Sequence, residues 1–386
     1  MQKVLLILPI GNNLMQKIKS KTICLTMIVK NEAHVIKRCL NSVKKFIDFW
    51  IIIDTGSTDN TKELIREVLV GIPGALHERP WKNFAFNRNE SLELAYNKAE
   101  YLLILDADEE LYCSENFAFP DLNHIAYEIM LETRQEKFYR AQLLKNLPTW
   151  RYNNIIHELL NLPKNEYIPK LNNIKIISHN DSARNQNPDK YKVDLQILKQ
   201  GLKEEPHNLY YMLHISQHYF HQKQFYLSLY YTERVIEKLA EKKIDNELMF
   251  YRWYCLYQIA QIKLAIKTQW HKVLSMYLKT YGYSSWHPAP LYMLGKHYFA
   301  KKNFYTAYIF LKEAISIAKT ADIGFLHKDI YYLTRIKFIF CAIKIGKISE
   351  AIKINYGLFI DTSLPIDLKE MVNANYKILK SNQTYA

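Results

Sequence analysis

The chain has few cysteines and no long apolar segment, and both absences limit the class of protein to which it can belong. The apolar run over residues 4–10 is too short to span a bilayer, and it lacks a signal-peptide cleavage pattern. The five cysteines show no paired spacing, which predicts neither a disulfide framework nor a cysteine zinc site; they are Cys24, Cys39, Cys113, Cys255 and Cys341. We therefore expect a cytoplasmic protein in which residues 1–20 form a disordered leader.

Acidic residues are in the minority: 38 Asp and Glu stand against 52 Lys and Arg, a formal net charge of +14. Such a balance suits nucleic acid, an anionic membrane face or phosphate-bearing substrates. The sequence has no arginine-rich block and no nucleic-acid motif, and its aromatic residues fall at helical spacing, which indicates a core rather than a base-stacking platform. We expect no nucleic-acid partner, and weak association with the anionic inner membrane face stays open.

Proline becomes sparser after about Tyr191, where long amphipathic patterns rich in Tyr, Leu and Ile begin. This change predicts that residues 191–386 are all helical. A chain of 386 residues is long enough for two domains, so we place their boundary between residues 190 and 191.

Two carboxylates follow an apolar run in the first half, since Leu102–Leu105 leads directly into Asp106-Ala107-Asp108. A continuous apolar run is typical of a strand that is covered on both faces, and ligands of open α/β sheets bind beyond the carboxyl ends of such strands. Paired carboxylates suit Mn²⁺ or Mg²⁺ that also binds substrate phosphates. The alternative is a solvated acidic turn.

Two more apolar runs end in polar loops. Ile23–Val29 precedes Lys30-Asn31-Glu32 and a helical pattern through Val43, and Trp50–Ile53 precedes Asp54. Gly56 allows a tight turn there, and Ser57, Thr58 or Asp59 can cap a helix that begins near Lys62. Strands that alternate with helices predict a parallel sheet, with the three loops meeting at its carboxyl edge.

These segments resemble those of a known family, the family 2 glycosyltransferases, whose nucleotide-sugar-binding GT-A fold is Rossmann-like, and especially the bacterial branch with C-terminal tetratricopeptide repeats. The resemblance covers about residues 22–208 and continues into the repeats. The matching blocks occur in the family's order: residues 27–32, 53–59, 81–89, 105–109, 151–158 and 176–179. The resemblance implies a GT-A domain over residues 21–190 and a tetratricopeptide-like domain over residues 191–386.

It also implies roles for individual residues in binding the donor. Asp54 would bind the uracil or ribose, Lys30 and Glu32 would line the nucleotide pocket, and Arg88 would face the diphosphate. The alternative for Arg88 is a surface salt bridge with Glu90 or Glu93. Many family members have two acids where this chain has Asp54-Thr55, which puts the donor base in doubt.

The metal ligands and the catalytic base come from the same resemblance. Asp108, assisted by Asp106, would hold the metal, and His179 would be a third ligand, with His157 as a weaker candidate. An inverting transfer needs a base for the acceptor, and Glu158 is the residue we expect to supply it, with Asp181 as a fallback. The alternative is that Glu158 caps a helix or orients the acceptor.

The helical half repeats itself with an offset of 79 residues. Tetratricopeptide units are about 34 residues long, so two units and an insertion would give this offset, and three or four irregular units would fill the domain. His218 and His297 occupy matching positions, which the repeat explains more simply than a metal site does. The matching positions at this offset are residues 218–220 and 225–226 against residues 297–299 and 304–305, and residues 211–213 match residues 292–294 at an offset of 81.

The sequence leads to three competing hypotheses about function. The first is a metal-dependent, inverting hexosyl- or N-acetylhexosaminyl-transferase that uses a UDP-sugar and a protein, peptide or glycan acceptor docked on the repeats, which could also pair two subunits. The second is a non-catalytic repeat scaffold whose GT-A domain binds nucleotide sugar. The third, a nucleotidyltransferase, is disfavoured because the loop Lys30-Asn31-Glu32-Ala33 has no glycine.

Overall fold

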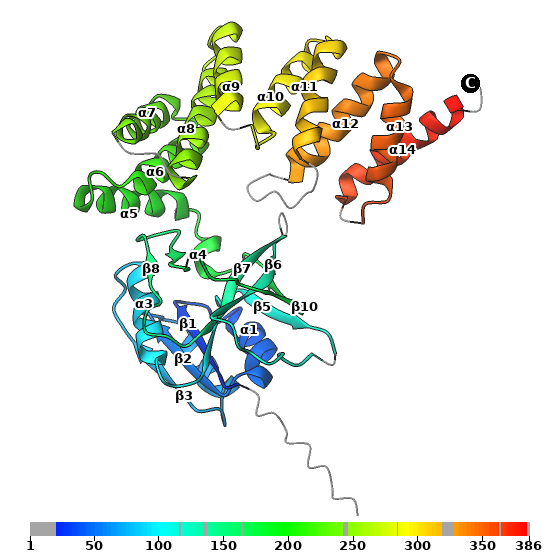
Figure 1. The fold of residues 1–386 in the computed structure, drawn as a ribbon. Helices are drawn as coiled ribbons and strands as arrows, with labels where there is room; N and C mark the ends of the chain where they lie inside the picture. Colours follow the sequence, from blue (N-terminus) through cyan, green and yellow to red (C-terminus); the bar gives the residue numbers. More distant parts are fainter. Residues whose placement is uncertain are drawn as a thin grey trace, which may run out of the picture.

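The computed structural model describes residues 21–115, 117–133, 137–163, 165–241, 246–283, 285–318, 328–362 and 364–383. It contains an α/β domain built on one large sheet, followed by an array of helices (Figure 1). The leader predicted over residues 1–20 lies outside the described residues. Within the described part, no helix has the length and the apolar character that a bilayer crossing requires.

The three strands predicted from the apolar runs are present as β1 (Ile23–Val29), β2 (Phe49–Asp54) and β4 (Tyr101–Ile104). They lie parallel, and β3 (Gly74–Glu78) extends the sheet beside β2. Between them run α1 (Ile36–Val43), the 3-10 turn η1 (Lys44–Phe46), α2 (Thr61–Val68) and α3 (Phe84–Ala95). The polar loops after β1, β2 and β4 therefore meet at one edge, as predicted.

The sheet is mixed, whereas the sequence predicted a parallel one. Its order is β3-β2-β1-β4-β7-β6-β10-β5, and β7 and β5 run antiparallel to their neighbours. Residues 133–136 alone separate β6 from β7, and so short a connection allows only an antiparallel pair. The added strands are β5 (Glu109–Cys113), β6 (Ala126–Glu132), β7 (Lys137–Lys145) and β10 (Lys170–Ser178), with a small second sheet of β8 (Tyr152–Asn153) and β9 (Leu159–Leu160).

Neighbouring residues of the central strands point to opposite faces, and both faces are covered. On one face Leu25, Ile52 and Leu103 pack with residues of α1 and α2. On the other, Leu102 and Ile104 pack with Leu92 and Ala95 of α3. Burial on both sides explains why these strands are continuous apolar runs, and it fixes the height at which the polar loops leave the sheet.

The helices after α4 (Ala183–Gln186) form hairpins in which each helix contacts the next. Four hairpins have the same turn: Lys223, Lys267, Lys302 and Gly346 adopt a positive φ of 59 to 78°. The residue after each donates its backbone N–H five residues back, the pattern of a Schellman cap. The helices are α5 (Lys190–Glu204), α6 (Leu209–His221), α7 (Phe225–Ala240), α8 (Asn246–Ala265), α9 (Trp270–Tyr283), α10 (Ala289–Ala300), α11 (Phe304–Ile317), α12 (Lys328–Lys344), α13 (Ile348–Phe359) and α14 (Ile366–Gln383).

The 79-residue offset is the distance between two of these turns, Lys223 and Lys302, with one further hairpin between them. The matching segments are α6–α7 and α10–α11, as the sequence repeat predicted. The predicted domain boundary falls at the start of α5. The first helices also pack on the α/β domain, because Ile156 lies in one apolar cluster with Leu198 of α5 and Tyr211 of α6.

A substitution at Gly295 tests how closely α10 and α11 pack. A Cβ at this position would lie 2.6 Å from Cγ and Cδ2 of the buried Leu311. We expect Gly295→Ala to destabilise the helical domain by about 1 to 3 kcal/mol, because the clash outweighs the gain in helix propensity of about 1 kcal/mol. Unfolding in urea followed by circular dichroism measures the change.

Gly357 in α13 is the matched control, since an added Cβ would meet no atom within 4 Å. Gly357→Ala should therefore stabilise by about 0.5 to 1 kcal/mol. Equal effects of the two substitutions would show that α10 and α11 are not in close contact.

Candidate active site

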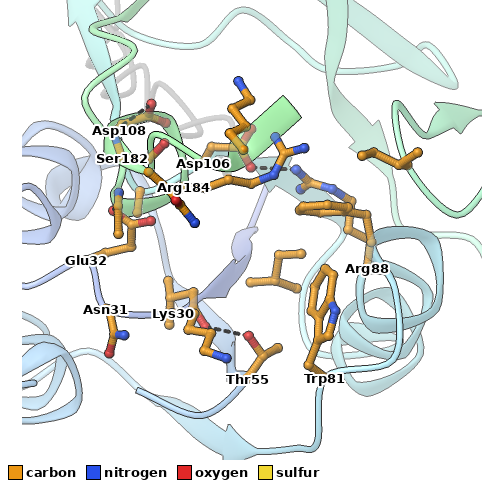
Figure 2. Close-up of a pocket in the computed structure, with 18 of the residues that line it drawn as sticks. Lys30, Asn31, Glu32, Thr55, Trp81, Arg88, Asp106, Asp108, Ser182 and Arg184 are labelled. Atoms are coloured by element: carbon orange, nitrogen blue, oxygen red, sulfur yellow. Dashed lines mark hydrogen bonds and ion pairs between the residues drawn. The ribbon is translucent and has the colours of Figure 1, made fainter. Parts of the chain in front are cut away.

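A cleft of about 620 Å³ opens at the carboxyl edge of β1 and β4 (Figure 2). Its floor is formed by residues 28–32, at the end of β1 and in the loop that follows, and by residues 106–108 after β4. One wall comes from α3 and the preceding loop, and another from residues 156–158 and 182–184. Helix α5 of the helical domain closes the end of the cleft with Lys190, Val193, Asp194 and Ile197.

The two aspartates after β4 both line the cleft, with different surroundings. Asp106 Oδ1 lies 2.6 Å from Arg88 Nη2; burial alone would raise the pKa of Asp106, but Arg88 and two further arginines lower it. Asp108 is 7% exposed, and its Oδ2 accepts long bonds of 3.3 Å from the backbone of Ser182 and the side chain of Asn185. Burial and the nearby Asp106 raise the pKa of Asp108.

Arg88 joins this acidic turn to the loop that carries Glu158. Its Nη2 pairs with Asp106, and its Nε lies 2.5 Å from Glu158 Oε1. The alternative of a surface salt bridge with Glu90 or Glu93 is wrong: Glu90 pairs with Arg79 and Glu93 with Arg151. Arg88 is therefore a buried bridge between two carboxylates, one at the sheet edge and one on the wall.

Helix α3 is fixed where it presents Arg88. The side chain of Asn83 caps the helix by accepting from the backbone N–H of Phe86 at 2.8 Å. The neighbouring Asn89 bonds both the N–H and the carbonyl of Tyr152, at 2.7 and 2.9 Å. The segment over residues 81–89 thus holds the loop that leads to Glu158 in two ways: Asn89 bonds the backbone of Tyr152, and Arg88 pairs with Glu158.

The loops after β1 and β2 are bonded to each other. The backbone N–H of Asn31 donates to Ser57 Oγ at 2.8 Å, and that of Glu32 donates to Thr61 Oγ1 at 2.8 Å. Asn31 has a φ of 57°, and Lys30 and Glu32 on either side of it line the cleft; that the cleft is the nucleotide pocket stays a prediction. Burial is the main cause that raises the pKa of Glu32 to about 7.

Asp54 lies under the floor of the cleft rather than in its lining. It is 1% exposed, and its Oδ1 accepts from the backbone N–H groups of Gly56 and Ser57 at 2.9 and 2.7 Å. Gly56, at a φ of 104°, forms the tight turn that the sequence predicted. Asp54 Oδ2 is buried without a hydrogen-bond partner among the described residues, so one oxygen beneath the cleft is left unsatisfied.

The backbone N–H of His179 donates to the carbonyl of Asp108 at 3.1 Å, so this residue lies beside the aspartate turn. Its ring pairs with Glu110 instead, with Nε2 2.9 Å from Oε2, and among the described residues the ligand atoms of Asp106, Asp108 and His179 do not all lie within 4.8 Å of one another. The role of His179 as a third metal ligand stays a prediction. Asp181, the fallback base, pairs with Arg38 at 2.7 Å instead.

Sequence reasoning missed three cations that line the cleft, Arg140, Arg184 and Lys190. Arg140 comes from β7 and pairs with Glu109 at 2.6 Å, and Arg184 pairs with Asp194 of α5 at 2.6 Å. Neither lies in a recognisable motif. Only the pairing of distant segments in the fold brings them to the site.

Residues 24–113 match the family model of glycosyl transferase family 2. They contain β1, β2, β4 and the aspartate turn, so the N-terminal domain is a family 2 glycosyltransferase domain, and tetratricopeptide-like repeats follow it. A prophage-derived glycosyltransferase of Bacillus subtilis, SunS, is 37% identical over 102 residues, which are 26% of this chain and 23% of SunS.

Two further relatives match with similar identity. The TPR repeat-containing protein Synpcc7942_0270 of Synechococcus elongatus is 32% identical over 149 residues, 36% of this chain and 35% of the relative. An uncharacterized glycosyltransferase of Rickettsia felis is 34% identical over 85 residues, 22% of this chain and 28% of the relative. The chain thus spans about a third or less of the length of the curated relatives it matches.

Among solved structures, the apo form of RapI is 18% identical, with a TM-score of 0.37 over 50% of this chain and 52% of that one. The TPR protein YrrB is 11% identical, with a TM-score of 0.35 over 48% of this chain and 84% of that one.

The raised pKa of Glu32 predicts a pH-dependent stability difference. Because the folded state holds this proton up to about pH 7 and the unfolded state only to about pH 4.5, stability falls as pH rises between these values. We expect the metal-free Glu32→Gln variant to match the natural chain near pH 4.5 and to be more stable by about 3 kcal/mol at pH 8. Urea unfolding at both pH values measures this.

The neighbouring Glu109, whose pKa is also raised by burial, is present in both proteins, so its titration cancels in the comparison. A difference that stays constant from pH 4.5 to 8 would contradict the assignment, because it would mean that Glu32 has the same pKa in the folded and unfolded states.

Proposed function

We propose that the chain is a metal-dependent glycosyltransferase that moves a sugar, as hexosyl or N-acetylhexosaminyl, from a nucleotide-sugar to a protein, peptide or glycan acceptor. The observation that carries the proposal is the placing of Asp106, Asp108, Arg88 and Glu158 around one cleft at the sheet edge. The family 2 match covers the strands that form this edge.

The charge of the cleft supports a role for a divalent cation. Its lining has five acidic side chains (Glu32, Asp106, Asp108, Glu158, Asp194) and five basic ones (Lys30, Arg88, Arg140, Arg184, Lys190). A dianionic diphosphate would therefore find no surplus of positive charge. In Asp106 and in Asp108, one of the two carboxylate oxygens takes no part in the strongest hydrogen bond of that side chain. This donor set fits Mn²⁺ or Mg²⁺ bound jointly by carboxylates and phosphates.

Once bound, such an ion would stabilise the negative charge that develops on the departing nucleotide. The chain's own residues would position the donor. Lys30 and Arg88 would contact phosphate oxygens, and Arg88 can do so by giving up one of its two carboxylate bonds. Asp54 would accept from the nucleoside with its unpartnered Oδ2, which favours a uracil N–H or a ribose hydroxyl.

Glu158 is the proposed base. It faces the cleft, its side chain is 13% exposed, and Arg88 holds one of its oxygens. If Arg88 turns to the diphosphate when the donor binds, Glu158 is freed to accept the acceptor's proton as the acceptor attacks the anomeric carbon. Donor binding and activation of the base would then be linked through a single guanidinium.

A donor screen tests the metal and the nucleotide. UDP-, GDP- and dTDP-sugars are titrated into the protein by calorimetry, with and without Mn²⁺. We expect Mn²⁺-dependent binding of the UDP-sugar, weakened at least tenfold by Asp108→Asn, because a carboxylate ligand is lost.

Glu110→Gln is the matched control for this screen, since it removes a nearby carboxylate that bonds His179 and does not line the cleft. Its affinity for the donor should be unchanged. If no nucleotide-sugar binds, the catalytic proposal fails. If one binds but no acceptor or water is ever glycosylated, the non-catalytic scaffold is the better account.

Replacing the proposed base tests its role directly. We expect Glu158→Gln to lower the rate of nucleotide release from the donor, onto water or an acceptor, by about 100-fold or more. Donor affinity should stay the same or rise, because Arg88 loses a competing carboxylate. A variant with full turnover would leave Glu158 as a residue that only orients Arg88.

A further inference from the structure

Three further ligand-type side chains meet at the end of the cleft where the helical domain closes it. They are His157 from the loop between β8 and β9, Asp194 from α5 and His218 from α6. One ligand atom from each lies within 4.8 Å of the other two, and among the described residues this is the trio that meets that criterion. His157 and Asp194 also line the cleft.

The backbone around each member holds it in place. His157 has a φ of 52°, and the hydroxyl of Tyr210 donates to its carbonyl at 2.6 Å. Its ring stacks on His214 with centroids 4.7 Å apart, and it lies 6.4 Å from the ring of His218. Asp194 is 1% exposed and His218 8% exposed, so two of the three are fixed inside the helical packing.

Packing in the repeat does not account for this trio. His297 occupies the matching repeat position of His218, but its ring lies flat on Trp270 with centroids 3.4 Å apart, and within the described part of the chain it belongs to no comparable ligand set. The rings of His157 and His218 have no hydrogen-bond partner among the described residues, although His218 is buried. Burial lowers the pKa of His218, and partial desolvation of the exposed His157 ring, which stacks on His214, lowers the pKa of His157 as well. Both imidazoles are therefore neutral, with lone pairs available, at pH 7.

Two neutral imidazoles and one carboxylate form the ligand set of a zinc site with an open fourth position. Tetrahedral Zn²⁺ needs its ligand atoms about 3.3 Å apart, so the trio must contract, and the exposed ring of His157 can move inward. Two cations oppose metal binding: Arg184 bonds Asp194 Oδ1 at 2.6 Å, and Lys190 lies nearby. The second oxygen of Asp194 is the one left for an ion.

We propose that His157, Asp194 and His218 bind a Zn²⁺ ion that links the catalytic domain to the first two helices of the repeat domain. The fourth position of the ion would face the cleft, beside the Glu158 loop. This site is separate from the carboxylate pair after β4, whose oxygen-only ligands favour Mn²⁺ or Mg²⁺. It does not depend on the proposed glycosyltransferase activity.

Zn²⁺ binding to the tag-free, EDTA-dialysed full chain in the absence of donor tests the proposal. We expect one saturable site by calorimetry, and Co²⁺ should give the visible absorption of a tetrahedral complex. His157→Ala and His218→Ala should each weaken Zn²⁺ binding by about 100-fold or more, since even outer-shell partners of a ligand are worth about 10 to 100-fold.

The control is His297→Ala, the repeat counterpart of His218, which should bind Zn²⁺ like the natural chain. Asp108→Asn should also bind it normally. The proposal is overturned if the natural chain binds no Zn²⁺, if His157→Ala and His218→Ala both keep full affinity, or if Asp108→Asn alone removes binding. Circular dichroism confirms that the variants are folded, and His157, which is exposed, is the substitution least disruptive to packing.

Discussion

Much of this molecule depends on one guanidinium, that of Arg88. It is buried and holds Asp106 at the edge of the sheet and Glu158 on the facing loop. A buried cation must be paired, and two carboxylates this close would repel each other without it. The ion pair therefore decides where the Glu158 loop sits, and that loop is also the segment on which α5 and α6 pack. The geometry of the site and the packing of α5 and α6 on the Glu158 loop therefore both depend on the ion pairs of Arg88.

The helical domain follows the α/β domain in the sequence, and it also forms part of the cleft. Lys190 and Asp194 of α5 line the same space as Asp108, and Tyr210 of α6 bonds the carbonyl of His157. The helical domain thus forms one end of the cleft, and this is where the proposed acceptor would bind.

The sequence was informative where chemistry depends on neighbours in the chain. Ile23–Val29 and the run before Asp106 predicted strands because burial on both faces requires continuous apolar residues, and the 79-residue offset predicted the paired hairpins. It failed where chemistry depends on distant segments. No local sequence pattern marks Arg140 and Arg184 as residues of the cleft. The β6–β7 pair is antiparallel, whereas a parallel sheet was expected, and the ring of His179 pairs with Glu110 of β5 rather than with the aspartates.

The four hairpin turns also give the helical array two unlike edges. One edge consists of the short left-handed turns at residues 222–224, 266–269, 301–303 and 345–347, which share one hydrogen-bond pattern. The other consists of the connections between hairpins, over residues 241–245, 284–288, 318–327 and 360–365, which have five, five, ten and six residues. Because the turns share one geometry while the connections vary in length, residues can be inserted at the second edge without altering any hairpin.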